Sequence, residues 1–146
     1  MTKVSIIGAG AVGTAIAYAA QIRGVCRELA LYDLNATKVR AEVLDLVHGM
    51  QFTPMTHITG GDDLEVCAGS DVVVVTAGAK QKPGQTRLDL AASNVAMCRE
   101  LIPRVVALAP DTILLLVTNP VDVVTCAAQQ FAGLPAGRVF GSGTVL

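Results

Sequence analysis

The sequence predicts an α/β fold, a doubly wound parallel sheet of six strands in the order 3-2-1-4-5-6. Apolar, β-branched runs alternate with helical segments along the 146 residues, which is the element order of such a sheet. The run Val72-Val73-Val74-Val75 shows no alternation of apolar and polar residues. Both faces of that strand must therefore be buried, as in a parallel sheet covered by helices on each side.

The elements follow in a simple order. The predicted strands are Lys3–Ile7, Leu29–Tyr32, His57–Thr59, Val72–Thr76, Ile113–Val117 and Arg138–Phe140. The predicted helices between them are Val12–Ile22, Ala36–His48, Arg87–Ala109 and Val121–Phe131. Gly24 and Gly49 stand where the C-caps of the first two helices are expected. Pro103 lies inside the third helix and predicts a kink or a break there.

A Gly-x-Gly-x-x-Gly turn follows the first strand and is formed by Gly8, Gly10 and Gly13. Gly8 makes the tight turn, Gly10 leaves room for a pyrophosphate, and Gly13 lets the next helix pack against the strand. The free N–H groups and the dipole at that helix start attract phosphates. An ordinary buried turn is the alternative. Asp33, which follows the second strand 20 positions after Gly13, favours a dinucleotide-binding domain over residues 1–146.

The identity of the nucleotide depends on Asp33, whose carboxylate accepts hydrogen bonds from a ribose 2′-OH and repels a 2′-phosphate. Leu34 and Asn35 follow, without an arginine to neutralise such a phosphate, so the predicted cofactor is NAD rather than NADP. FAD is a more distant alternative. Asp33 could instead cap the next helix, although Asn35 suits that task equally well. Lys38 lies near the adenosine phosphates in one interpretation and is a solvated helix lysine in another.

Composition excludes several classes of function. A net charge of −1 argues against nucleic-acid or membrane-surface binding, and no apolar run is long enough to span a membrane. The four cysteines are widely spaced, so no metal site is expected and the thiols fit a cytoplasmic protein without a signal peptide. Hydrophobic residues make up 52% and charged residues 16%, which suggests a face covered by more chain or by a partner.

The loop from Ala77 to Thr86 follows the fourth strand and contains Gly78, Pro83 and Gly84. Ligands of open α/β sheets bind at the carboxyl ends of strands, so this loop is a candidate lid. Arg87 can donate to a carbonyl oxygen and stabilise the charge that develops as hydride arrives. Gln81 offers a neutral donor and acceptor to a substrate side group. Alone, each of these two side chains would more often be an ordinary surface residue.

With Thr118–Asp122 and Gly141–Thr144, these residues resemble the L-lactate and malate dehydrogenase family over the whole chain. The resemblance implies that Arg87 polarises the substrate carbonyl, that Asn119 contacts substrate and nicotinamide ribose, and that Gln81 reads the substrate. Asp122 joins them as a substrate-binding residue. It also implies that the dinucleotide is lined by Val12, Gly78, Ala79, Asn94, Thr118, Asn119 and Ser142.

The same resemblance implies a substrate, a small 2-oxo acid. Malate enzymes carry arginine at position 81, whereas glutamine suits the methyl group of pyruvate, and Val121 points the same way. The implied reaction is therefore pyruvate plus NADH plus a proton giving L-lactate plus NAD, as in pyruvate fermentation after glycolysis. Two alternatives stay open: a domain of a malate or other 2-hydroxy-acid dehydrogenase, and a stand-alone NAD-binding module.

The family also needs a histidine general acid/base, an aspartate that orients it, and an arginine that grips the substrate carboxylate. These features belong to the second half of the family's chain. The two histidines here, His48 and His57, are poorly placed for proton exchange at the substrate. We therefore expect that the substrate domain is absent and the isolated chain is inactive. We expect the full-length enzyme to be a homo-oligomer, with helix Ala36–His48 facing a partner.

Overall fold

The structure, a computed structural model, describes residues 2–79 and 84–142. Six parallel strands form one sheet in the order β3-β2-β1-β4-β5-β6, which confirms the predicted fold class and strand order. Parallel pairing places Val4 beside both Leu29 and Val72, so β1 lies at the centre of the sheet. The strands are β1 (Lys3–Ile7), β2 (Glu28–Tyr32), β3 (His57–Gly61), β4 (Val72–Val75), β5 (Ile113–Leu116) and β6 (Val139–Gly141).

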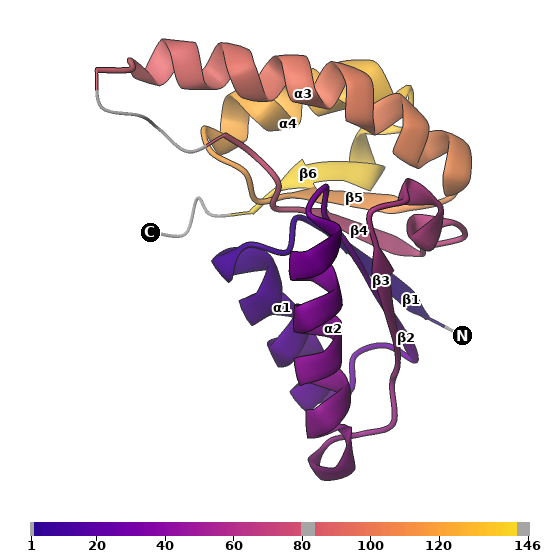
Figure 1. Ribbon diagram of the computed structural model, residues 1–146. Coiled ribbons are helices and arrows are strands. Elements are labelled where there is room, and N and C mark those ends of the chain that lie inside the picture. Colours follow the sequence, from indigo (N-terminus) through magenta and orange to yellow (C-terminus); the bar gives the residue numbers. More distant parts are fainter. Residues whose placement is uncertain (1, 80–83, 143–146) are drawn as a thin grey trace.

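Helices cover both faces of the sheet (Figure 1). One face carries α1 (Ala11–Arg23) and α2 (Ala36–Gly49), and the other carries α3 (Arg87–Leu108) and α4 (Val121–Ala132). Three short 3-10 helices complete the chain at Met50–Phe52, Leu64–Cys67 and Ala136–Arg138. Within the described ranges, no helix is both long enough and apolar enough to span a membrane.

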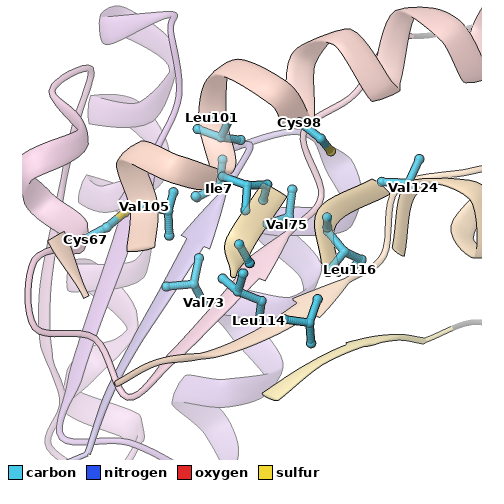
Figure 2. Packing of buried hydrophobic residues seen from close by; sticks show 14 of the residues in the cluster. Ile7, Cys67, Val73, Val75, Cys98, Leu101, Val105, Leu114, Leu116 and Val124 are labelled. Atoms are coloured by element: carbon cyan, nitrogen blue, oxygen red, sulfur yellow. The ribbon is translucent and has the colours of Figure 1, made fainter. Parts of the chain in front are cut away.

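Two hydrophobic cores lie on opposite faces of the sheet. Val73 and Val75 face the core under α3 and α4, which Figure 2 shows, whereas Val74 between them belongs to the core under α1 and α2. All three side chains are at most 4% exposed. The unbroken valine run is thus explained, because each successive residue enters a different core. Burying one such side chain stabilises the fold by about 1.5–3 kcal/mol.

Most of the predicted element ends shift by one or two residues, but the predicted C-cap at Gly49 is wrong. Gly24 does end α1 in the left-handed conformation, with φ 60°, and its N–H donates to the carbonyl of Gln21. Gly49 has φ −78° and remains inside α2, because the chain tightens directly into the 3-10 helix at Met50–Phe52 and needs no left-handed residue. The helix α2 therefore ends at a cap residue with right-handed geometry, Met50.

Of the kink or break predicted at Pro103, the break is absent, because α3 continues through this residue to Leu108. Pro103 lies on an exposed side of the helix, where the carbonyl that loses its N–H partner can meet water. At the sheet edge, β3 extends two residues further than predicted. A Cβ on Gly60 would lie 2.6 Å from Val43 Cγ2, so this glycine lets α2 pack directly on the strand.

Candidate dinucleotide site

A cavity of about 840 Å³ opens at the carboxyl ends of β1, β2, β4 and β5. It lies where the strand order reverses between β1 and β4, which is the usual ligand position in open α/β sheets. The start of α1 and one side of α3 complete its walls. Nine of the residues predicted to bind cofactor or substrate line it: Gly8, Gly10, Val12, Gly13, Asp33, Gly78, Ala79, Thr118 and Asn119.

The three glycines of the turn are required for different reasons. Gly8 has φ 106°, and a Cβ there would lie 2.7 Å from the backbone nitrogen of Ala77. A Cβ on Gly13 would overlap the carbonyl oxygen of Gly8. A Cβ on Gly10 would meet no described protein atom within 4 Å. The protein's own packing thus explains Gly8 and Gly13, whereas the space above Gly10 belongs to the cavity.

The N-terminus of α1 offers unpaired backbone donors to this cavity. Its N-cap, Gly10, makes no side-chain capping bond, and the first turn contains no acidic residue. The first N–H donation to a preceding carbonyl runs from Thr14 to Gly10, at 2.9 Å. The N–H groups before Thr14 have no carbonyl one turn back to receive them. Together with the helix dipole, these donors favour an anion at this point of the cavity.

Asp33 stands at the end of β2 and is half-buried in the cavity wall. Its Oδ2 accepts a hydrogen bond of 2.8 Å from the backbone N–H of Ala9, and its Oδ1 accepts one of 3.0 Å from Asn35. The carboxylate therefore holds the glycine turn beside β2. Each carboxylate oxygen keeps lone-pair capacity for a further donor, such as a ribose hydroxyl. The N-cap of α2 is Asn35, whose side chain accepts from the backbone N–H of Lys38.

Two side chains join the loops that follow β4 and β5, and we call them the loop clamp: Asn94 and Thr118. Asn94 accepts from the N–H of Ala79 at 2.8 Å and donates to the carbonyl of Asn119 at 2.7 Å. Thr118 donates to the carbonyl of Ala77 at 2.7 Å. A Cβ on Gly78 would overlap Thr118 Cγ2 and approach Asn94 Oδ1 to 3.2 Å. Gly78 is thus needed for the loop clamp to close.

The start of α3 is built differently from that of α1. Thr86 is its N-cap and accepts from the N–H of Asp89 through its hydroxyl, while Asp89 accepts from the N–H of Thr86. These reciprocal bonds form a capping box. The Thr86 hydroxyl also donates to Asp89 Oδ2 at 2.6 Å, and this bond, followed by the one from the Thr86 backbone N–H, lowers the pKa of the Asp89 carboxyl. Arg87 follows the cap and is exposed to solvent.

Several predicted site residues lie outside the cavity. Lys38 is exposed on α2, and Ser142 is held beside β5 by a 2.8 Å bond from its N–H to the carbonyl of Leu116. Asp122 is in the first turn of α4 and lines a separate, open groove of about 430 Å³ with Cys126 and its neighbours. Gln81 lies outside the described residues. The roles of these residues remain predictions.

One wall of the cavity was not predicted. Residues of α3 form it, namely Leu90, Met97, Glu100, Leu101 and Arg104. Met97, Leu101 and Arg104 are spaced by four and three positions, which places them on one face of a helix. That spacing is visible in the sequence. It does not reveal whether such a face meets the core or a cavity.

Neither histidine lines the cavity, since His48 is in the last turn of α2 and His57 begins β3. In the part of the chain that the structure describes, no group of three or more His, Cys, Asp or Glu residues is arranged to hold a metal ion. All four cysteines are free thiols, and burial raises the pKa of Cys98 to about 11. The cavity is therefore lined by backbone donors, the carboxylates of Asp33 and Glu100, the guanidinium of Arg104, the amide of Asn119 and apolar walls.

Comparisons with known proteins match this arrangement. Residues 2–141 match the family model described as lactate/malate dehydrogenase, NAD binding domain. The chain is 54% identical over 145 residues to an L-lactate dehydrogenase of Bifidobacterium animalis subsp. lactis, covering 99% of this chain and 45% of that protein. It is 55% identical to an L-lactate dehydrogenase of Synechococcus, covering 99% and 47%. The chain thus spans about half the length of the curated relatives it matches.

Solved structures agree. The minor L-lactate dehydrogenase of Enterococcus mundtii, in a ligand-bound form, superposes with a TM-score of 0.92 at 44% identity, over 98% of this chain and 46% of that one. A lactate dehydrogenase from a Medee basin deep-sea metagenome library has the same TM-score at 38% identity, covering 98% and 46%. Both likenesses extend over nearly the whole described fold.

Proposed function

We propose, from the premise that the chain belongs to the lactate/malate dehydrogenase family as its NAD-binding domain, that it binds NAD(H) for an L-lactate dehydrogenase. The observation that carries the proposal is the open space above Gly10 beside the uncapped start of α1. Protein packing explains the other two glycines of the turn but leaves this space to a ligand.

The residues present fit the dinucleotide. The backbone donors at the start of α1 would hold the pyrophosphate, and the Asp33 carboxylate would accept from the adenosine ribose hydroxyls. Since Asp33 lies at one end of the cavity, the nicotinamide half must extend across β1 and β4 toward Asn119 at the end of β5. When bound, NADH supplies the hydride that reduces a carbonyl.

The proposed substrate is pyruvate, because Gln81 is neutral. Oxaloacetate carries a second carboxylate on the corresponding carbon, and closing a dry site around that charge without a partner is expensive. Arg87 would donate to the carbonyl oxygen shared by both substrates and stabilise its developing charge. Asn119 would position both substrate and nicotinamide ribose, and Asp122 would assist from the start of α4. A malate or other 2-hydroxy-acid dehydrogenase is the second candidate.

Proton transfer is not assigned to this chain. Neither His48 nor His57 lines the cavity, and a general acid must lie within hydrogen-bond reach of the atom it protonates. We therefore propose that these 146 residues alone bind NADH without reducing pyruvate. A cytoplasmic location and a homo-oligomeric full enzyme belong to the same proposal. Free thiols fit a reducing compartment, and the exposed Leu44 and Val47 of α2 offer apolar area to a partner.

Calorimetric titration of the chain with NADH and with NADPH tests the nucleotide assignment. We expect saturable heat with NADH and weaker binding of NADPH, because Asp33 repels the 2′-phosphate. Absence of saturation at millimolar NADH would contradict the proposal. Lactate formation by the purified chain would contradict its inactivity, and absence of lactate with normal NADH binding would support it.

Exchanging Asp33 sharpens the test. Asp33→Ser combined with Leu34→Arg removes the repelling carboxylate and adds a phosphate partner, so the preference should move toward NADPH by about ten-fold or more. Asn35→Ala is the matched control, because it removes the α2 cap and leaves Asp33 intact. A double variant that prefers NADH as strongly as the parent would show that Asp33 acts only through Ala9 and Asn35.

Gln81→Arg, made in the full-length enzyme, tests the substrate. The new guanidinium would pair the second carboxylate of oxaloacetate and stand unpaired beside the methyl group of pyruvate. The ratio of kcat/KM for the two substrates should shift toward oxaloacetate by about 10³. Arg87→Gln should slow both substrates alike. A ratio within about ten-fold of the parent's would remove Gln81 as the specificity residue and favour the second candidate.

A further inference from the structure

Asn94 has an unusual position for a residue expected to line a cofactor. Its side chain is 1% exposed, and it does not line the cavity. It comes from α3, two helical turns beyond Arg87. Its amide reaches two loops that follow different strands, at Ala79 and at Asn119.

The two bonds fix which way the amide points. The oxygen accepts from the Ala79 N–H, and the nitrogen donates to the Asn119 carbonyl. A side chain here must therefore accept at one end and donate at the other, which an amide does and a carboxylate or an alkyl group does not. Because the side chain is buried, losing either bond leaves a backbone group without a partner. The two hydrogen bonds within the protein therefore require an asparagine at this position, whether or not a ligand is bound.

We infer that Asn94 is a positioning residue: it sets the separation of the β4 and β5 loops and thereby aligns Ala79 and Asn119 for the nicotinamide half of the dinucleotide. The inference rests on the proposed function, because it needs NADH to occupy the cavity with its nicotinamide end at Asn119. It replaces direct cofactor contact by Asn94 with an indirect role. Since Arg87 lies on the same helix, the same amide also links the helix that carries Arg87 to both loops.

The two ends of the cavity make this role separable from general stability. The adenosine end depends on Gly10, which follows β1, and on Asp33, which follows β2. The two hydrogen bonds of Asn94 involve neither residue. The other end depends on the loops that Asn94 joins. Disturbing Asn94 should therefore weaken a ligand that reaches Asn119 and spare a ligand that stops short of it. NADH and ADP are such a pair, because ADP lacks the nicotinamide half.

The test compares the affinities of NADH and ADP for the parent chain and two variants. Asn94→Leu removes both bonds at similar volume, and Asn94→Asp keeps an acceptor for Ala79 while placing an oxygen opposite the Asn119 carbonyl. We expect each to weaken NADH by about ten-fold and to leave ADP within about two-fold of the parent. If Asn94→Leu does not fold, the nearly isosteric Asn94→Asp carries the test alone.

Gln21→Leu is the matched control. Gln21 is likewise 1% exposed, and its amide donates 2.8 Å to the carbonyl of Leu46, but it lies between α1 and α2 away from the loop clamp. This variant should lower the unfolding temperature and leave the NADH-to-ADP affinity ratio unchanged. Parallel weakening of NADH and ADP by the Asn94 variants, or no change in either, would overturn the inference while the parent still binds NADH. A parent that binds neither nucleotide would overturn the proposed function and this inference together.

Discussion

The helices α1 and α3 follow neighbouring strands of the sheet, β1 and β4, in the chain, yet their first turns are built in opposite ways. The turn at Gly10 has no side-chain cap, and the cavity reaches its backbone. The turn at Thr86 is closed by a capping box, in which Thr86 and Asp89 satisfy one another's N–H groups.

The difference shows how each helix start can recognise a ligand. Where the backbone donors are unpaired, as at α1, they can bind a phosphate whatever chemical group the phosphate is attached to. Where the chain's own side chains satisfy such donors, as Thr86 and Asp89 do at α3, the proposed recognition falls to an exposed side chain, Arg87. The first design suits the part of a cofactor that never changes, and the second suits a substrate that differs between enzymes.

Gly13→Ala should have the largest effect, because it damages the α1 turn itself. The new Cβ would overlap the Gly8 carbonyl and lie 2.8 Å from Thr76 Oγ1. We expect the free energy of unfolding, measured in urea, to fall by about 3 kcal/mol and NADH binding to be lost. Gly137→Ala is the control, since a Cβ there meets no described atom within 4 Å. An unchanged urea midpoint for Gly13→Ala would contradict the close packing.

Gly10→Ala should separate binding from stability. Gly10 has φ −76°, which alanine adopts freely, and a Cβ there meets no described protein atom within 4 Å. The unfolding free energy should stay within about 0.5 kcal/mol of the parent's. NADH affinity should fall by about ten-fold or more, because the methyl group occupies the space assigned to the pyrophosphate. Unchanged affinity in calorimetry would mean that no ligand approaches the backbone there.

Thr86→Ala should affect α3 and leave the cofactor site intact. Loss of the capping hydroxyl should lower the free energy of unfolding by about 1 kcal/mol. NADH affinity should not change, because Thr86 does not line the cavity. Thr86→Ser keeps the hydroxyl and should restore most of the stability. A Thr86→Ala variant with weakened NADH binding would show that the two helix starts are not independent.

Acid should produce the smallest effect, at the same capping box. The pKa of Asp89 is lowered from its ordinary value of 3.8 by its bonds with Thr86, so the ionised form stabilises the helix start. That stability is fully present above the ordinary value and is lost as the pH falls through the lower folded one. The amide protection factors in the first turn of α3, corrected for the intrinsic exchange rate at each pH, should therefore fall in acid. Asp89→Asn should lack this acid-dependent loss of protection, and equal pH profiles would contradict the assignment.

Sequence predicted best where local chemistry alone decides the structure. The Gly8–Gly13 turn and Asp33 encode backbone conformation and a strand end, and the cavity contains them. The cap predicted at Gly49 and the break considered at Pro103 are absent for the opposite reason. A 3-10 turn follows Gly49, and Pro103 lies on an exposed side of α3 that tolerates proline. A local sequence pattern indicates which residue type a turn or cap requires. It does not indicate when the neighbouring structure makes that turn or cap unnecessary.

The rest of the candidate site depends on contacts between segments that are far apart in the sequence. Family resemblance marked Asn94 as a site residue, but only the three-dimensional arrangement shows it buried between Ala79 and Asn119. The α3 wall at Met97 and Leu101 was likewise hidden, because an apolar helix face has the same pattern against a core or a cavity. Lys38 and Asp122 remain predictions, since the cavity does not include them.

The central position of β1 has a consequence for the order in which the chain is made. Val4 pairs on one side with Leu29 and on the other with Val72, so β1 leaves the ribosome well before residues 72–75, which cover its second edge. Until then, an apolar strand edge stays open to pairing with other chains, a hazard that slow, long-range sheets share. Among the strands that are paired on both sides, the strand that carries the glycine turn is therefore the one whose second edge waits longest for its partner during synthesis.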